Sequence, residues 1–362
     1  STFTKTKDEF LDLQNEIATK LAGELKGGLD AVEAQQLAKK ATDNPEAQAE
    51  YQAGRREWNI RSKEGFENAI KHFEKAIELD PDYADPYVGF ADTYGLMPTY
   101  NFADTSEAMP KAKSYAEEAI KLNPNLAEAY TSLAWVMHQY EYNWKEAEAN
   151  YRRAIELNPN YATGHQWFAI FLSNIGRNNE AIKLIVKASE LDPQSMIIKS
   201  TAVEIHLLAE QYVQALKYCD KTFEIDPYFS YALWFKHAKI NEQNSKENID
   251  HIKEAIRRYP NQPMHRKTLA EVYWNIGDRE EAMEQVIELL DRYHGSFRKA
   301  HFADLYFVMG KPDHAYRWLQ KAIEAKEGNV LFYGVLPNLK KYQQEPRFRE
   351  LYKKINHPLY VD

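Results

Sequence analysis

The sequence offers few residues arranged for catalysis. It contains no phosphate-binding P-loop, no GxGxxG, no GxSxG and no HExxH motif. Its 11 histidines are scattered, and none is followed four residues later by a second histidine. His138 lacks a partner at metal-ligand spacing, and carboxylate pairs such as Glu146 and Glu148 fall on polar sides of expected helices. The sequence therefore predicts no catalytic residues, no metal site and no cofactor.

Prolines recur along the chain at a nearly constant interval. The spacings are 43, 35, 34, 34 and 33 residues between Pro81, Pro124, Pro159, Pro193, Pro227 and Pro260. Most of these prolines end near-copies of one phrase, such as AIELDP at 76–81 and AIELNP at 154–159. A repeat of this length is typical of a helical solenoid, a stack that usually holds partners.

Small and bulky residues repeat within each unit as well. In the unit that ends at Pro193, the order is Phe168, Ala169, Leu172, Gly176, Ala181, Ile185 and Ala188. This order closely resembles the tetratricopeptide repeat (TPR), a hairpin of two helices. Small residues such as Ala169 and Ala181 let the two helices approach closely, and bulky ones fill the space between hairpins. The residue before each proline is pushed out of the helical region, so the second helix ends there.

The resemblance implies an all-α fold, a right-handed superhelix of about eight helix-turn-helix repeats. Bulky–small pairs mark the first helices at Phe90/Ala91, Leu133/Ala134, Phe168/Ala169, Leu269/Ala270 and Phe302/Ala303. Two units are degenerate, one with Ala202/Val203 and the next with Lys236/His237. The 43-residue interval holds extra residues within Leu96–Pro110, which form either a tolerated longer loop or a loop that binds.

The two ends depart from the repeat. Residues 8–26 predict an amphipathic helix, with apolar residues at Phe10, Leu13, Ile17, Leu21 and Leu25. A final helix that caps the last hairpin is predicted by Phe348, Leu351, Tyr352 and Ile355. We therefore expect an amino-terminal helical segment or cap at 1–45, the TPR array at 46–327, and carboxyl-terminal capping helices at 328–362.

Both ends carry a further resemblance. The runs DEFLDLQNEIATKLAGEL and PRFRELYKKINHP are similar to the carboxyl-terminal region of bacterial multidomain regulators, in which a TolB-like segment precedes the repeats. In those proteins the amino-terminal module is a winged-helix domain, an adenylate cyclase or a serine/threonine kinase. The resemblance implies a sensing or docking module. Because residue 1 is Ser, an effector domain or a membrane segment upstream is also an expectation.

Composition narrows the environment and the partners. The net charge of −8 disfavours attachment to nucleic acid or to anionic lipid. No apolar run long enough to span a bilayer occurs, so we expect no membrane insertion and a cytoplasmic location, or a periplasmic one if a membrane segment precedes residue 1. The single cysteine excludes an internal disulfide. Cys219 stands where other units carry Tyr151 or Ile185, which predicts a core residue.

The resemblance also implies a binding face. In a TPR superhelix the first helices line a concave groove, so the residues on their non-packing side should face it. Spacing from each bulky–small pair gives Trp135, His138 and Gln139; Gln166, Ser173 and Asn174; Trp234, Asn241 and Glu242; and Glu271, Trp274 and Asn275. Indole rings and amides suit a peptide, a helix or a partner domain. The alternative is that the tryptophans pack between repeats.

The predicted function is a non-catalytic protein-interaction scaffold. The Lys, Arg and Asn clamp of chaperone-tail-binding TPR proteins is not evident, because the matching places hold Thr131, Trp135, Gln166 and Ile170. Two alternatives stay open. One is a regulatory or substrate-docking portion of an enzyme, a cyclase or a kinase, whose catalytic domain lies upstream. The other is a homo-oligomer formed through the face near 230–255, with Tyr228, Phe229 and Tyr231.

Overall fold

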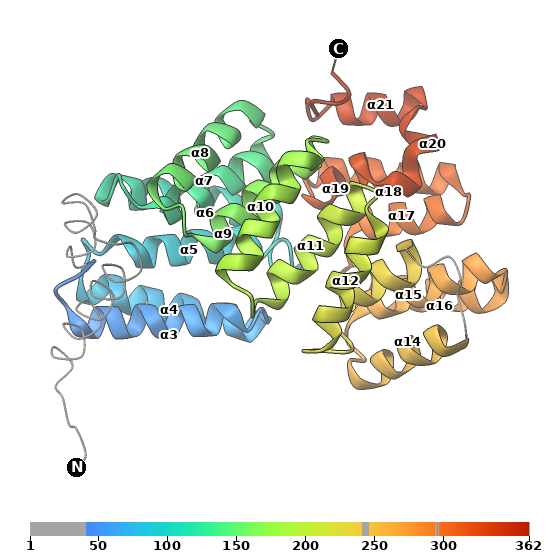
Figure 1. Cartoon of the computed structure of the whole chain (residues 1–362), viewed down its shortest axis with the longest axis horizontal. Coiled ribbons are helices and arrows are strands. Elements are labelled where there is room, and N and C mark those ends of the chain that lie inside the picture. The colour runs from blue at the N-terminus through green and yellow to red at the C-terminus, as the bar shows by residue number, and fades with distance from the viewer. Residues whose placement is uncertain (1–40, 241–245, 294, 296, 362) are drawn as a thin grey trace.

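The computed structural model of the chain describes residues 41–240, 246–293, 295 and 297–361. Over these residues the fold is all-α, and antiparallel helices follow one another as hairpins (Figure 1). This confirms the predicted all-α repeat superhelix. The helix predicted at 8–26 lies outside the described residues, so it stays a prediction.

The described part contains eight hairpins. The first four pair α3 (Pro45–Asn59) with α4 (Lys63–Leu79), α5 (Ala84–Leu96) with α6 (Thr105–Leu122), α7 (Ala127–Val136) with α8 (Trp144–Leu157), and α9 (Ala162–Asn174) with α10 (Asn178–Leu191). The next four pair α11 (Met196–Leu208) with α12 (Tyr212–Phe223), α13 (Ser230–Trp234) with α14 (Lys246–Arg258), α15 (Pro263–Ile276) with α16 (Arg279–Tyr293), and α17 (Lys299–Val308) with α18 (Pro312–Glu324). Shorter elements follow: α19 (Asn329–Val335), the 3₁₀ turn η3 (Pro337–Leu339), α20 (Lys340–Gln343) and α21 (Pro346–Lys353).

The recurring proline ends the second helices as expected. The α4 helix stops at Leu79, and Asp80 before Pro81 is extended, with a φ of −149°. The freed proline carbonyl then accepts a hydrogen bond from a side chain six residues on. The pairs are Tyr87 with Pro81 at 3.1 Å, Tyr130 with Pro124 at 3.0 Å, and His165 with Pro159 at 2.8 Å. This bond ties the start of each next hairpin to the end of the one before.

Small residues set the distance between helices. The second-helix alanines are fully buried, at Ala69, Ala112, Ala147, Ala181, Ala215, Ala282 and Ala315. Cys219 is also fully buried, which confirms the predicted core residue, and burial raises the pKa of its thiol to about 12. In the first two hairpins, the ring of Phe73 fits between Gly54 of α3 and Gly89 of α5.

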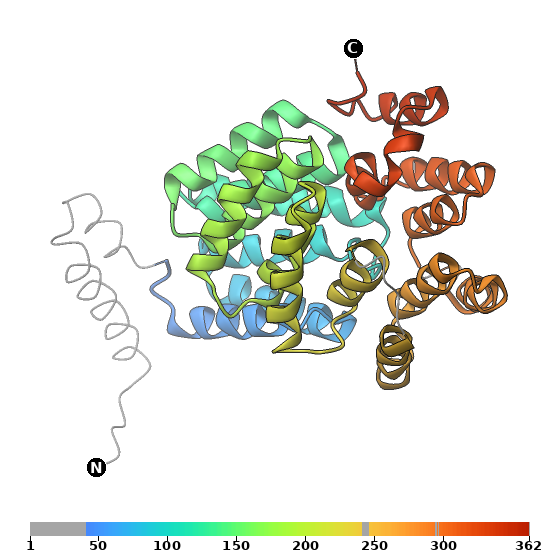
Figure 2. The same ribbon diagram turned by 45° about the vertical axis from the view of Figure 1, so that its right-hand side comes forward.

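Two main hydrophobic cores run through the array. The first extends from Trp58 to Ile205, and the second from Val203 to Tyr360, so both reach α11. The insertion predicted within Leu96–Pro110 is a packed loop between α5 and α6, because Tyr100 and Phe102 set their rings 5.7 and 5.8 Å from Phe66. In both views the red α19 lies next to the teal and green helices, in agreement with its contacts with α9 (Figures 1 and 2).

The fit around Phe73 gives a test of helix spacing. A Cβ atom added at Gly89 would lie 2.6 Å from the Phe73 ring. We expect Gly89→Ala to destabilise the chain by about 1–3 kcal/mol through overpacking, although alanine favours a helix by about 1 kcal/mol. Urea unfolding measures the change. If crowding is the cause, Phe73→Leu in the same chain recovers part of the loss, and strictly additive effects of the two changes would contradict this explanation.

Candidate protein-interaction surface

The first helices of the hairpins lie next to one another along the array. Contacts join α3 to α5, α5 to α7, α7 to α9, and α9 to α11. We call the surface that the first helices α3, α5, α7, α9, α11, α13, α15 and α17 share the inner face. Those sequence-predicted binding residues that the structure describes lie on these helices or at their carboxyl ends.

Several of the predicted binding residues pack between neighbouring first helices. Trp135 is 6% exposed; its ring lies 4.7 Å from that of Trp167, and its Nε1 donates to the Gly95 carbonyl at 3.1 Å. Gln166 donates to the Thr201 hydroxyl at 2.8 Å. The prediction that Trp135 and Gln166 face an open groove is wrong, because adjacent first helices lie close enough to bury them. Ser173 is buried as well.

A π-helical turn carries the next two predicted residues. In η1 (Met137–Glu141), His138 and Gln139 are buried, and the Asn174 amide lies 3.1 Å from Nε2 of His138. The Gln139 amide lies so close to Gly328 that a Cβ atom there would collide with it. His138, Gln139 and Asn174 are therefore not open to solvent as predicted.

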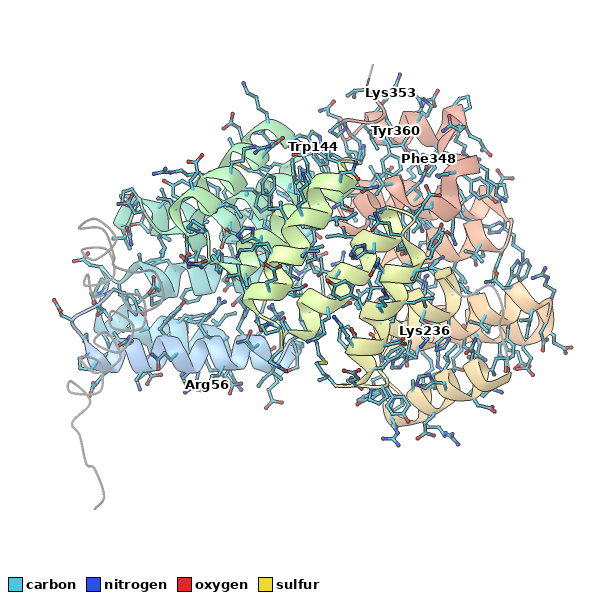
Figure 3. The ribbon with its side chains drawn as sticks, viewed as in Figure 1. Arg56, Trp144, Lys236, Phe348, Lys353 and Tyr360 are labelled. Carbon is cyan, nitrogen blue, oxygen red and sulfur yellow. The ribbon has the colours of Figure 1, made fainter. Side chains whose placement is uncertain are left out.

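The segment that covers these residues is the chain's own carboxyl-terminal part. The α19 helix contacts α9, and Lys326 places its ammonium 4.2 Å from the centre of the Tyr140 ring. His357 sets its ring 5.4 Å from Trp144, which Figure 3 labels near Tyr360. We call these contacts the closing contact. It joins regions about 200 residues apart. A further link over a similar separation is the hydrogen bond that Arg298 Nε donates to the Thr99 carbonyl at 3.2 Å.

A fully buried ion network occupies the inner face of the carboxyl-terminal half. Lys239, from the π-helical η2 (Phe235–Ile240), lies 2.9 Å from Glu271 and 3.1 Å from Asp304. Lys267 bonds to Glu271 and, at 2.6 Å, to Asp304. Trp234, only 2% exposed, donates its Nε1 to Glu271 at 3.3 Å. Trp234 and Glu271 are thus internal residues, which corrects their prediction as groove-facing.

The charges in this network stabilise one another. Burial opposes the charge of Lys239, but Asp304 and Glu271 outweigh it and raise its pKa. Burial would likewise raise the pKa of Asp304, but the two lysines lower it. Sequence reasoning missed Lys239, Lys267 and Asp304. A signal existed, since Glu271, Asp304 and Asp92 each stand two residues after the bulky residue that marks a first helix.

The remaining predicted residues lie at the end of α15 or outside the described part. Trp274 is half-buried under the Arg279 guanidinium, whose central carbon lies 3.8 Å from the ring centre, and Asn275 is exposed. Asn241 and Glu242 fall outside the described residues. Tyr228, Phe229 and Tyr231, the predicted self-association cluster, are half-buried rather than exposed.

The accessible part of the inner face is a polar stripe across α3, α5, α7 and the start of α9. We define it by five half-buried residues: Tyr51, Arg55, Asp85, Glu128 and Tyr161. Arg55 pairs with the buried Asp92 at 2.7 Å. Burial, followed by the nearby Glu128, raises the pKa of Asp85 to about 6. The stripe therefore offers tyrosine hydroxyls and carboxyls that are half-buried rather than buried among the described residues.

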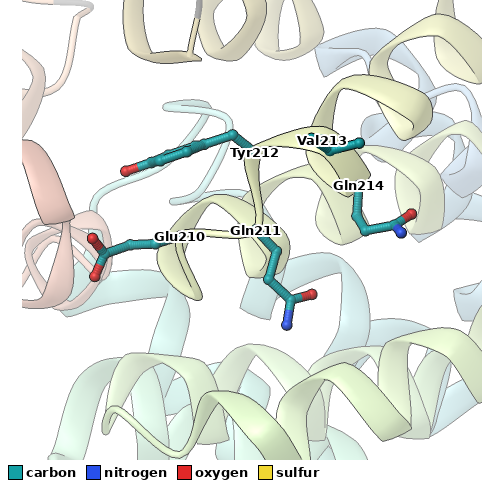
Figure 4. A pocket seen from close by; sticks show the side chains of 5 residues that line it. All are labelled: Glu210, Gln211, Tyr212, Val213 and Gln214. Carbon is teal, nitrogen blue, oxygen red and sulfur yellow. The ribbon is translucent and has the colours of Figure 1, made fainter.

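The described part of the chain shows little that would bind a small molecule or a metal ion. Among those residues, no group of three His, Cys, Asp or Glu side chains could hold a metal ion. A hollow of 470 Å³ is lined by one turn, Glu210 to Gln214 (Figure 4). Ligand sites usually gather groups from several elements, and this hollow does not. Across the described helices, none is both long and apolar enough to cross a membrane.

Stacked antiparallel hairpins with small residues at the crossings define an all-helical repeat protein. Two family models of the tetratricopeptide repeat match the chain, at residues 62–83 and 150–183. The chain therefore contains tetratricopeptide repeats.

Curated relatives match parts of this chain. Protein O-mannosyl-transferase TMTC3 from Homo sapiens is 24% identical over 206 residues, which are 53% of this chain and 22% of that protein. Anaphase-promoting complex subunit 3 from Schizosaccharomyces pombe is 22% identical, over 50% of this chain and 27% of that protein. Transcriptional regulator HilA from Salmonella typhimurium is 25% identical, over 40% of this chain and 26% of that protein. The chain thus spans only 22%, 27% and 26% of the length of these three relatives.

Solved structures resemble this chain in fold. The match to yeast Tom70 has a TM-score of 0.47 at 16% identity, and it covers 88% of this chain and 69% of the Tom70 chain. YrrB, described as a TPR protein with an unusual peptide-binding site, has a TM-score of 0.33 at 24% identity and covers 57% of this chain and 98% of its own.

The buried ion network gives a test of what holds the inner face together. Lys267→Met leaves two buried carboxylates with one lysine, and we expect a loss of about 3–5 kcal/mol in the free energy of unfolding. Lys236→Met is the matched control, because the Lys236 ion pair with Asp220, at 2.8 Å, is partly exposed; it should cost less than about 1 kcal/mol. Equal losses by urea unfolding would contradict a special role for burial.

The closing contact gives a pH prediction. Burial, together with the neighbouring His357, lowers the pKa of His138 to about 3, and burial lowers that of His357 to about 4. The unfolded chain therefore takes up protons first, so stability is full above the unfolded pKa of about 6.5 and is lost as pH falls from there towards 4. We expect His357→Gln to reduce the slope of unfolding free energy against pH by about 1.4 kcal/mol per pH unit near pH 5. The exposed His314, changed to Gln, should leave the slope unaltered; equal slopes for all three proteins would refute the assignment.

Proposed function

We propose that this chain is a protein-interaction scaffold that holds a peptide, a helix or a partner domain on its inner face. The observation that carries the proposal is the closing contact. The inner face of α7 and α9 holds a short helix, α19, that is remote in sequence, through Gln139 beside Gly328 and Tyr140 beneath Lys326. A surface that accommodates one such helix has the shape and polarity to accommodate another.

The polar stripe is the part of the inner face left for a partner. Its tyrosines present rings that bury area with little loss of conformational freedom, and its carboxyl groups have no basic side chain of their own beyond Arg55, which already pairs with Asp92. Trp274 and Asn275 extend the accessible surface at α15. The residues predicted from sequence at α7 and α9 would support this surface from beneath.

The biological setting that we propose is the sensing or docking module of a bacterial regulator. Support comes from the sequence resemblance at both ends of the chain and from the 143-residue match to a transcriptional regulator. A second candidate is a docking portion of an enzyme, which the partial match to an O-mannosyl-transferase favours. Both candidates assign the same task to this chain, because the array would hold a partner while another domain acts.

Site-specific photo-crosslinking tests the proposed surface. A benzophenone amino acid replaces Tyr51 or Tyr161 in the polar stripe, and in a matched control it replaces Ile287, which is 54% exposed on the second helix α16. Irradiation in a cell lysate followed by mass spectrometry should recover the same protein from both stripe positions and not from Ile287. Recovery from Ile287 alone would move the binding surface to the second helices, and no crosslink at any position would contradict the scaffold function.

A further inference from the structure

Two arginines stack on one buried tryptophan near the end of α3. The central guanidinium carbons of Arg55 and Arg61 lie 4.0 and 3.4 Å from the centre of the Trp58 ring. Trp58 itself is only 2% exposed. Stacking of this kind fixes both planar cations in position at the amino-terminal end of the inner face.

The hydrogen bonds of this cluster are incomplete. Arg55 is paired with Asp92, which in turn accepts a bond of 2.6 Å from Ser132. Nη1 of Arg61 and Nε1 of Trp58 are both buried, and neither has an acceptor among the residues that the structure describes. Buried donors are nearly always satisfied in folded proteins, because an unsatisfied one costs free energy. Two such donors in stacked side chains mark a place where a ligand could supply the acceptors that the described residues do not.

The backbone holds Arg61 in an unfavourable conformation. Its φ of +57° lies in the left-handed region, which a residue with a Cβ atom adopts at a cost. Its amide still bonds to the Trp58 carbonyl at 3.3 Å, so the turn brings the guanidinium back over the indole. Backbone strain of this kind concentrates at functional sites, where the position of one side chain matters.

Burial and neighbouring charges both act on Arg61. Burial lowers the pKa of Arg61 to about 10, Tyr100 acts to raise it, and the positive charge of Arg55 lowers it further. Beside Tyr100, the Thr99 carbonyl accepts a bond from Arg298, a buried cation whose pKa burial lowers and the charge of Glu327 acts to raise. Three carboxylates lie near the cluster: Asp92, which pairs with Arg55, and Asp85 and Glu128 of the polar stripe, whose pKa values the charge of Arg55 acts to lower.

We propose that Trp58 and Arg61 form an oxyanion-binding site on the inner face, which takes a carboxylate or phosphate group carried by a peptide partner. The guanidinium and indole N–H groups are donors only, so they match an acceptor with several lone pairs and reject a cation or a second donor. The peptide part of this inference rests on the proposed function, whereas the oxyanion part rests on the two unsatisfied donors alone. The overall charge of −8 argues against a nucleic acid as the source of the phosphate.

Isothermal titration of the full chain tests the site with three probes. These are sodium phosphate, an acetylated Glu-rich decapeptide, and the same peptide with one phosphoserine. A decauridylate serves as a fourth ligand, which tests whether the site prefers a nucleic acid. We expect at least one peptide to bind, and Arg61→Gln and Trp58→Phe each to weaken it about tenfold, the effect of losing one bond to a charged group. Arg56→Gln is the matched control, since Arg56 is exposed and lies on α3, the helix that carries Trp58. It should bind like the unchanged chain.

Thermal unfolding separates a binding role from a structural one. Trp58→Phe keeps an aromatic ring but removes the unsatisfied donor and part of the indole ring, so we expect a small fall in Tm from lost packing together with the fall in affinity. A lower Tm with unchanged affinity would make Trp58 structural and overturn the site, as would the absence of binding by every probe. Tighter binding of decauridylate than of either peptide would overturn the peptide partner. Arg61-dependent phosphate binding without crosslinks at the polar stripe would leave the site standing and refute the scaffold function.

Discussion

The close approach of neighbouring helices is the constraint on which the rest of this structure depends. Each crossing is set by a glycine or an alanine, as where Gly54 and Gly89 leave room for the Phe73 ring. Because a repeat contacts mainly its neighbours, any rotation between two hairpins accumulates along the array. Over eight hairpins this curvature brings α19 back against α9, and the superhelix closes on itself.

Closure changes the role of the inner face. In an open array Gln139 and Asn174 would be available to a partner. Here Gly328 covers Gln139, and Asn174 is hydrogen-bonded to His138. The polar side chains of the inner face are therefore mostly used within the chain, and the accessible remainder is confined to the polar stripe. Access to anything deeper requires the closing contact to separate, which would expose His357 beside Trp144.

Much of the fold could be predicted from the sequence, because a repeat period and the sizes of its residues are local properties. The 34-residue spacing indicates the hairpins, and the prolines mark where second helices end. The burial of Trp135 could not be predicted in the same way, since spacing tells on which side of a helix a residue lies and not how tightly the superhelix curls. The Lys267 bond to Asp304 joins residues 37 positions apart, and no short motif encodes it.

The two buried charge clusters of the inner face differ in one respect. In the carboxyl-terminal half, Lys239 and Lys267 balance Glu271 and Asp304, so the network is neutral and its members have partners. Around Trp58, Arg55 takes the buried carboxylate of Asp92, and Nη1 of Arg61 has no acceptor in the described part of the chain. A network that serves packing alone gains stability from neutrality, as the first one does. The proposed ligand would supply the acceptors that the described residues do not give to Trp58 and Arg61.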